Sequence, residues 1–310
     1  MQKPLFRSLL VIAFLSILLT SCYKDESGAP INYGDEAATQ SKDNNEFSSQ
    51  IDAIVNDAYM ILESNGSFAG RPSDVITGVC NASFDLDTLS NPRTITIHYS
   101  GLNCHGTHNR SGTVIISMAA NSRWKDAGAT ITATYTDLVI TRVTDNQKLI
   151  INGSHVITNI SGGLLVQLPT LNSITHRVTS NGMNVKFEDA SQRTWQVARQ
   201  RVFTYNNGIV MTVTGLHTEG SLQNIAEWGT NRFGRTFTSS ITQPLVFRQD
   251  CNARLVSGEI KHIVPVFTVV GTFGLDINGN PTNCPGNGNY YCKLVWTGPQ
   301  NSTYSLLFPY

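Results

Sequence analysis

The stretch from Arg93 to Tyr99 reads Arg-Thr-Ile-Thr-Ile-His-Tyr, and its apolar and polar side chains alternate without a break. The stretch from Thr130 to Thr136, Thr-Ile-Thr-Ala-Thr-Tyr-Thr, repeats the pattern. A period of two with many β-branched residues is typical of a strand with one buried face. We therefore expect Ile95, Ile97 and Tyr99 to face the core of a β-sheet.

Turn dipeptides separate similar runs along the rest of the chain. Asn181-Gly182, Asn207-Gly208 and Asn278-Gly279 accept the positive φ angles of tight hairpins. No ten-residue helical pattern interrupts the runs beyond residue 75, which argues against parallel β-α-β winding. The sequence predicts an all-β, antiparallel protein, as a β-sandwich or a strongly curved sheet.

One amphipathic helix is expected on the N-terminal side of the strands, at residues 46–64. Its apolar stripe recurs at helical spacing and consists of Ile51, Ile54, Val55, Ala58, Ile61 and Leu62. The polar face carries Asp52, Asp57 and Glu63, which anionic lipid would repel. We therefore expect this helix to pack on the sheet.

The first residues carry an export signal. Lys3 and Arg7 precede an apolar run that is too short to span a bilayer comfortably, as in a signal peptide. The run ends in Leu19-Thr20-Ser21-Cys22, which resembles a bacterial lipobox. We expect residues 1–21 to be a lipoprotein signal peptide, and Cys22 to carry the diacylglycerol and palmitate that anchor the chain in a membrane.

Residues 22–45 are rich in Gly, Ala, Ser, Asn and charge, which predicts a flexible tether. Its first part, Tyr23-Lys24-Asp25-Glu26, resembles the surface-export signal of Bacteroidota-type lipoproteins. The expected location is the outer membrane, lipid-anchored on the cell surface, with the periplasmic face as the alternative.

Five short motifs are distributed over the strand region. They are Cys104-x5-Arg110-Ser111-Gly112, Ala127-Gly128-Ala129-Thr130-Ile131-Thr132, Gly229-Thr230-Asn231-Arg232-x-Gly234-Arg235-x-Phe237, Gln243-Pro244-Leu245 and Asp250-Cys251. Together they resemble an uncharacterised group of Bacteroidota-type outer-membrane lipoproteins. The group has no assigned reaction, so the resemblance implies location and architecture only.

Two of these motifs share one form. Asn109-Arg110-Ser111-Gly112 and Asn231-Arg232-Phe233-Gly234 both place an arginine between asparagine and a later glycine. From the helix and strand patterns, residues 46–310 are expected to form the helix and an antiparallel β domain. Two related β units, at about 75–180 and 181–310, are one alternative, and chance reuse of a turn motif is the other.

The cysteines predict disulfides, because export leads to an oxidising compartment. Cys80 and Cys104 flank consecutive strand patterns and are the expected pair. Pairing among Cys251, Cys284 and Cys292 stays open, because spacing does not determine connectivity.

Neither a metal nor a cofactor is predicted. Cys104-His105-Gly106-Thr107-His108 offers three donors without a fourth ligand, so an ordinary hairpin loop explains it better. The sequence contains no P-loop, G-x-S-x-G or H-E-x-x-H motif. Surface positions on strands are expected for the remaining histidines, His98, His155, His176, His217 and His262.

Composition excludes one class of partner. The chain balances 22 Lys and Arg against 22 Asp and Glu, so it has no basic excess for nucleic acid.

Residues 220–235 alternate poorly and combine tryptophan with arginine, as binding hot spots and sugar-stacking surfaces do. The candidate binding loop comprises Glu227, Trp228, Arg232, Phe233 and Arg235. The alternative is a hairpin loop whose aromatic side chains fold back on the core.

The leading hypothesis is a lipid-anchored envelope protein that is not an enzyme. It would be a binding or structural module for a glycan or another envelope protein. The alternative is a periplasmic lipid-handling carrier, with the helix against a concave sheet around an apolar pocket. A polysaccharide-active enzyme is the third hypothesis, and it needs two suitably placed carboxylates.

Overall fold

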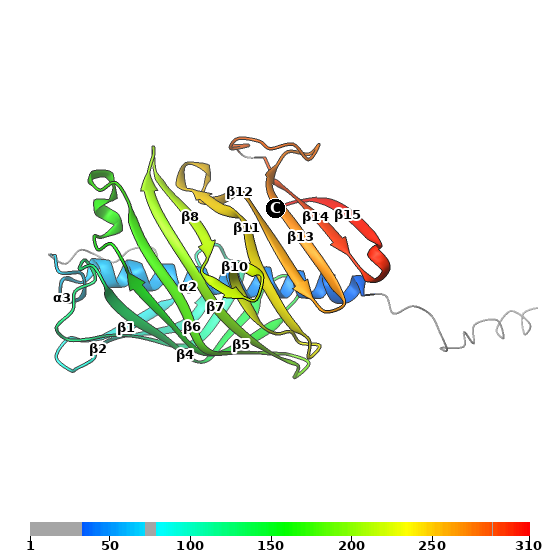
Figure 1. The fold of residues 1–310 in the computed structure, drawn as a ribbon. Coiled ribbons are helices and arrows are strands. Elements are labelled where there is room, and N and C mark those ends of the chain that lie inside the picture. Colours follow the sequence, from blue (N-terminus) through cyan, green and yellow to red (C-terminus); the bar gives the residue numbers. More distant parts are fainter. Residues whose placement is uncertain (1–32, 72–78, 287) are drawn as a thin grey trace, which may run out of the picture. The chain divides into compact units, whose positions relative to one another are not determined.

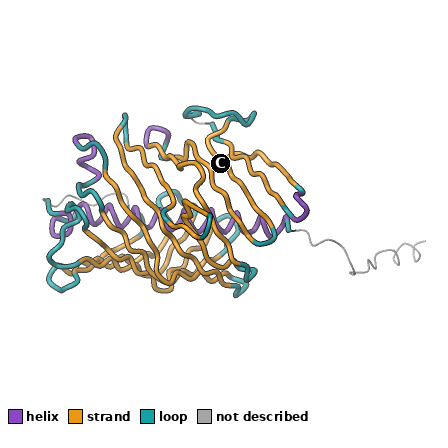
Figure 2. Tube along the Cα trace, in the orientation of Figure 1, coloured by secondary structure: helices purple, strands orange, loops and turns teal. Residues whose placement is uncertain are grey.

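A computed structural model describes residues 33–71, 79–286 and 288–310 of the chain, and Tyr33–Tyr310 forms one compact unit. The predicted signal peptide, the predicted lipidation site Cys22 and the predicted export signal Lys24-Asp25-Glu26 lie outside the described residues. Within the unit, one long helix crosses the inner face of a large curved sheet (Figures 1 and 2).

The helices are α2 (Gly34–Ser64), α3 (Gly66–Ala69), η1 (Leu165–Thr170), η2 (Gln249–Cys251) and η3 (Pro299–Asn301). The strands of the first half are β1 (Ala82–Asp87), β2 (Arg93–Leu102), β3 (His108–Met118), β4 (Ala129–Arg142), β5 (Lys148–Asn159), β6 (Ile174–Phe187) and β7 (Gln192–Tyr205). Those of the second half are β8 (Ile209–Gly215), β9 (His217–Glu219), β10 (Leu222–Thr230), β11 (Thr236–Arg248), β12 (Arg254–Val264), β13 (Phe267–Leu275), β14 (Tyr291–Thr297) and β15 (Thr303–Pro309).

The predicted antiparallel all-β class is confirmed, and the architecture is a single sheet. Its main order runs β1 to β7, then β10 to β15, and the neighbouring strands pair antiparallel. The boundary expected near residue 180 between two related units falls inside β6, which pairs with both β5 and β7. The strands on both sides of this boundary therefore belong to one sheet.

Two short strands share one position in the sheet. β7 and β11 are long, and each pairs with β10 along one part of its length and with β8 along another. At the junction, a Cβ atom on Gly215 would lie 1.9 Å from the backbone oxygen of Asn224. Only glycine allows so close an approach of the two backbones.

The inner face of the sheet follows the predicted alternation. Ile95, Ile97 and Tyr99 on β2 are buried, as expected, and the inward residues of β3 and β4 continue the same apolar cluster. The stripe predicted for residues 46–64 packs against this cluster, and all six of its members are buried. The helix and the inner face therefore form one core.

The helix is longer than expected. Residues 34–45, which we assigned to the flexible tether, form the first turns of α2. Their buried face includes Gln40 and Asp43 as well as Ala37, so no apolar stripe announces it. The prediction of a tether at these residues was wrong because their contacts with the sheet are largely polar.

Carboxylates of α2 pair with arginines of the strands and of the β10–β11 turn along almost the whole helix. The pairs are Glu36–Arg235 at 3.0 Å, Asp43–Arg232 at 2.6 Å, Glu46–Arg142 at 2.9 Å, Asp52–Arg199 at 3.6 Å and Asp57–Arg110 at 3.0 Å. Asp52 also pairs with Arg201. The face that looks polar in sequence is therefore partly a second docking face, directed at the sheet.

Replacement of Asp52 should destabilise the fold strongly. In Asp52→Ala, Arg199 and Arg201 lose a shared partner, and the Arg201 side chain is only 6% exposed. Removing one partner of a buried ion pair leaves an uncompensated charge, so we expect a loss of about 3 kcal/mol in the free energy of unfolding. Chemical denaturation measures it.

Asn56→Ala is the matched control, because Asn56 is exposed on the same helix. This change should stay within about 0.5 kcal/mol of the parent. Equal unfolding midpoints for the Asp52 and Asn56 variants would contradict the role of the ion pairs.

Candidate functional site

A charged pocket of about 320 Å³ lies where α2 meets the ends of three hairpins. We use this name for the hollow lined by Lys42, Asp43, Glu46, Arg142, Gln147, Lys148, Leu149, Phe187, Glu188, Asp189 and Arg232. These residues come from α2, the β4–β5 hairpin, the β6–β7 hairpin and the β10–β11 turn. Its size suits a small polar ligand.

Arg232 is held on one wall of the charged pocket. It donates two hydrogen bonds to the Asp43 carboxylate, at 2.7 and 2.6 Å, and its guanidinium lies 3.5 Å from the centroid of the Phe187 ring. The third guanidinium nitrogen of Arg232, Nη1, lies 3.6 Å from a carboxylate oxygen of Asp189. Burial raises the pKa of Asp43, although the Arg232 contacts oppose that rise. Bidentate pairing and stacking together fix the orientation of the guanidinium.

Arg142 is held on a second wall. Its guanidinium donates hydrogen bonds to Glu46 at 2.9 Å, to Asp145 at 2.9 and 2.7 Å and to Gln147 at 2.7 Å. The guanidinium of Arg142 also lowers the pKa of Asp145. Glu46 in turn lies 2.6 Å from His108, so helix and sheet are tied together at this point.

Two charged groups at the mouth of the pocket remain available. The side chains of Lys148 and Glu188 are exposed, and neither side chain forms a hydrogen bond or ion pair with another residue within the described ranges. The pocket thus combines fixed side chains with one free ammonium and one free carboxylate. Donors and acceptors arranged in this way suit a polyhydroxylated or zwitterionic ligand.

The predicted binding loop does not form a single surface. Residues 222–230 form β10, and the next turn leads to β11. Glu227 is buried, where it accepts hydrogen bonds from Ser48 and Trp195 and pairs with Arg199.

The other four predicted loop residues lie in different surroundings. Arg235 pairs with Glu36, and Arg232 is the only one of the five predicted residues that lines the charged pocket. Trp228 stacks on His217 at 4.1 Å between ring centroids, and Phe233 is 46% exposed. Lys42 and Asp43 escaped the sequence analysis because residues 34–45 showed no apolar period. Glu46 begins the helix that was predicted, but no local pattern singled it out as a pocket residue.

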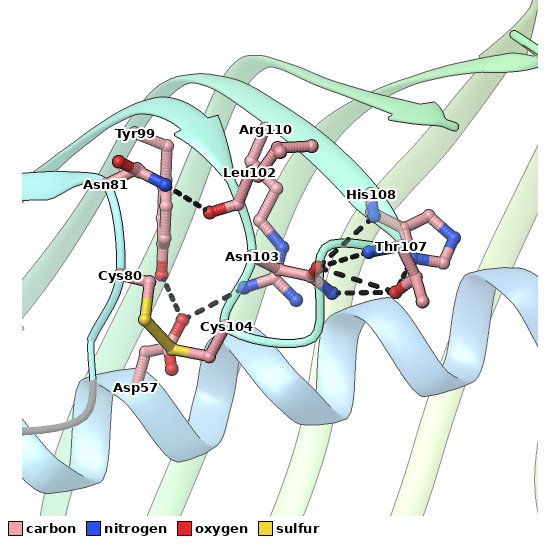
Figure 3. Close-up of a disulfide and its surroundings, with 10 residues drawn as sticks. All are labelled: Asp57, Cys80, Asn81, Tyr99, Leu102, Asn103, Cys104, Thr107, His108 and Arg110. Carbon is pink, nitrogen blue, oxygen red and sulfur yellow. Dashed lines mark hydrogen bonds and ion pairs between the residues drawn. A yellow bond between two sulfur atoms is a disulfide. The ribbon is translucent and has the colours of Figure 1, made fainter.

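The predicted Cys80–Cys104 disulfide is present, with Cα atoms 5.2 Å apart (Figure 3). It lies beside α2, where Asp57 accepts hydrogen bonds from Tyr99 and Arg110, each at 3.0 Å. The disulfide therefore links the two ends of the β1–β2 hairpin, beside a contact between α2 and the sheet.

Among the three cysteines left open, Cys251 pairs with Cys284, and Cys292 is free and buried. Burial raises the pKa of the Cys292 thiol to about 12. Asp250 lies next to the second disulfide, but disulfide sulfurs are not the thiolate ligands that a metal requires.

Three histidines expected on the surface are buried instead. His155, His176 and His262 point into the core, and burial lowers the pKa of each to about 3. The His176 ring lies among the rings of Tyr59, Trp124 and Phe203, with ring centroids 5.0 to 5.3 Å apart. The prediction was wrong because histidine on an alternating strand resembles a polar outward residue, although its ring can also pack in an aromatic core.

Searches of family models, curated proteins and solved structures found no match to this chain. Within the described residues, no helix combines the length and apolar character needed to span a membrane.

The buried histidines should make the fold sensitive to acid. Their pKa of about 3 in the folded state lies below the ordinary value of 6.5, so the unfolded chain binds more protons between these values. The free energy of unfolding therefore falls as pH falls from 6.5 towards 3, by as much as about 4 kcal/mol per histidine.

His176→Phe should flatten this fall when unfolding is measured from pH 7 to pH 4, whereas exposed His105→Phe should not. Burial also raises the pKa values of Asp43, Asp57 and Glu63, which gives a slope of opposite sign in every variant. The measurement therefore compares the pH dependence of the free energy of unfolding between variants. An unchanged slope in His176→Phe would contradict the assignment of His176 as a buried histidine with a lowered pKa.

Proposed function

We propose that this chain is a lipid-anchored envelope protein of the outer membrane whose β unit binds a glycan in the charged pocket without catalysing a reaction. The charged pocket carries the binding proposal, since two of its arginines are fixed by other side chains before any ligand arrives. Preorganised polar groups lose little conformational entropy on binding. The lipobox that ends in Cys22 and the resemblance to Bacteroidota-type lipoproteins support the anchoring.

Glycan chemistry fits the pocket better than a lipid. Saccharide hydroxyls both donate and accept hydrogen bonds, and the pocket offers arginine and lysine donors beside carboxylate and amide acceptors. Phe187 adds an apolar surface, although its ring is already covered by Arg232. An acyl chain would instead leave these polar groups without partners.

The lipid-carrier hypothesis receives little support from the packing under α2. Phe47, Ile51 and Ile54 are buried in the same cluster as the inner face of the sheet. The helix is thus part of a filled core. An apolar hollow does lie beside β14 and β15, but it is open to the surface.

The pocket carboxylates favour binding over hydrolysis. A glycosidase needs one carboxyl group that is free to protonate the leaving group and a second that acts as nucleophile or base. Asp43 and Glu46 are each engaged by an arginine, and hydrogen bonds donated by Ser191 lower the pKa of Asp189. Glu188 is then the one carboxylate lining the described pocket without such a partner, so the second free carboxyl group that hydrolysis needs is missing from this lining. We therefore keep a non-catalytic role as the proposal.

Binding should depend on the two available charges at the pocket mouth. In a panel of neutral, uronic-acid and sulfated oligosaccharides, we expect one class to bind. A Lys148→Ala/Glu188→Ala variant should then bind at least about tenfold more weakly, as expected when charged hydrogen bonds are lost. Isothermal titration calorimetry measures the affinity, and analysis of reducing ends checks that the glycan is not cleaved.

Lys186→Ala is the matched control, because Lys186 is exposed in the same hairpin and does not line the pocket. Its affinity should equal that of the parent. The binding proposal fails if no oligosaccharide binds or if the double variant retains full affinity.

Anchoring and surface exposure are tested together on intact cells. Mass spectrometry should find acyl groups on Cys22, and external protease should cleave the β unit. A Lys24/Asp25/Glu26→Ala variant should be protected, because its export signal is lost. Cleavage of both proteins to the same extent would contradict the role of this signal, and protection of both would place the protein on the periplasmic face.

A further inference from the structure

An apolar groove of about 220 Å³ lies at the end of the sheet, beside the first turns of α2. Its sheet side includes Val269 on β13, Leu294 and Trp296 on β14, and Tyr304 and Leu306 on β15. Trp296 lies opposite Tyr304 and Leu294 opposite Leu306, so the four side chains share one face of the two strands. We call these four residues the β14–β15 patch.

The patch remains open because α2 begins with small side chains at this point. Ala37, Ala38 and Ser41 form the helix side of the groove, and no charged residue lines it. Tyr304 is 71% exposed and Leu306 is 61% exposed. A contiguous apolar and aromatic face of this kind marks a contact surface.

We propose that the β14–β15 patch rests on the lipid bilayer in which Cys22 is anchored. The inference rests on the proposed anchoring. Cys22 and Tyr33 are separated by residues 23–32, so they lie at most about 40 Å apart even if this segment is fully extended. The groove begins at Gly34, the residue after Tyr33, and in Figure 1 the first turns of α2 lie at the β14–β15 end of the sheet.

The chemistry of the patch suits the interfacial region of a bilayer. Tyr304 combines a largely exposed apolar ring with a hydroxyl group, and tyrosine concentrates where acyl chains meet headgroups. Trp296 lines the groove beside it and is only partly exposed, with its indole N–H buried. Leucine adds apolar area that enters the acyl region. A weak contact is sufficient here, because the lipid on Cys22 already holds the domain close to the membrane.

A second copy of the chain is the competing occupant. β15 pairs only with β14 among the described strands, so its outer edge is free for another strand. The bilayer is the better occupant because the apolar side chains lie on the face of β15, whereas strand addition would use its edge. The test separates the two.

The test uses the intrinsic fluorescence of Trp296. The full acylated chain is reconstituted in phosphatidylethanolamine–phosphatidylglycerol vesicles whose acyl chains carry bromine, a quencher that acts at short range. Trp124 and Trp195 are buried in the core, and Trp228 is stacked on His217. We expect quenching in the parent protein and its loss in Trp296→Phe.

A Tyr304→Ser/Leu306→Ser variant should lose most of the quenching while keeping its unfolding midpoint, since both side chains are largely exposed. Tyr205→Ser is the control, because Tyr205 is half-exposed at the end of β7 and lies outside the patch. Its quenching should match that of the parent.

Absence of quenching in an acylated parent would overturn the inference and leave the proposed anchoring intact. So would equal quenching in the parent and in Trp296→Phe. A dimer in sedimentation experiments that dissociates in the Tyr304→Ser/Leu306→Ser variant, without quenching in the parent, would assign the patch to a second copy. If Cys22 carries no acyl group, the anchoring fails. Quenching at saturating vesicle concentration then decides the membrane contact by itself.

Discussion

The burial of arginines on the inner face of the sheet is the constraint on which the rest of this structure depends. Arg110 and Arg201 are almost inaccessible to solvent, and a guanidinium in such a place needs a counter-charge. α2 supplies it through Asp57 and Asp52. Sheet and helix are therefore complementary in charge as well as in apolar surface, and neither face is complete without the other. This explains why a helix with so many acidic residues lies against a core.

The same constraint produces the surface features that matter for function. Asp43 holds Arg232 and Glu46 holds Arg142, so the charged pocket forms where the row of ion pairs reaches the hairpin ends. At the start of α2 the side chains that face the sheet are small, and the apolar groove appears there. Both features lie beside the first turns of the helix.

Much of the fold was predictable because strand alternation and helix periodicity are local properties. The buried faces of β2 and α2 and the Cys80–Cys104 disulfide followed from spacing along the chain. The first turns of α2 did not, since Gln40 and Asp43 are buried through polar contacts that no hydrophobic period records. Arg232 was chosen for its neighbours in sequence, yet its role comes from Asp43, which is distant in the chain.

The sequence by itself determined the class of the fold, the buried sides of β2 and of the first part of β4, and the position of the apolar part of the helix, because each depends on residues a few positions apart. Only the tertiary structure decided that the sheet is single, which acid meets which arginine, and that Cys251 pairs with Cys284. It also decided that His155, His176 and His262 are buried. These outcomes depend on contacts between distant segments, and a charged or titratable residue has the same local signature whether it meets water or a buried partner.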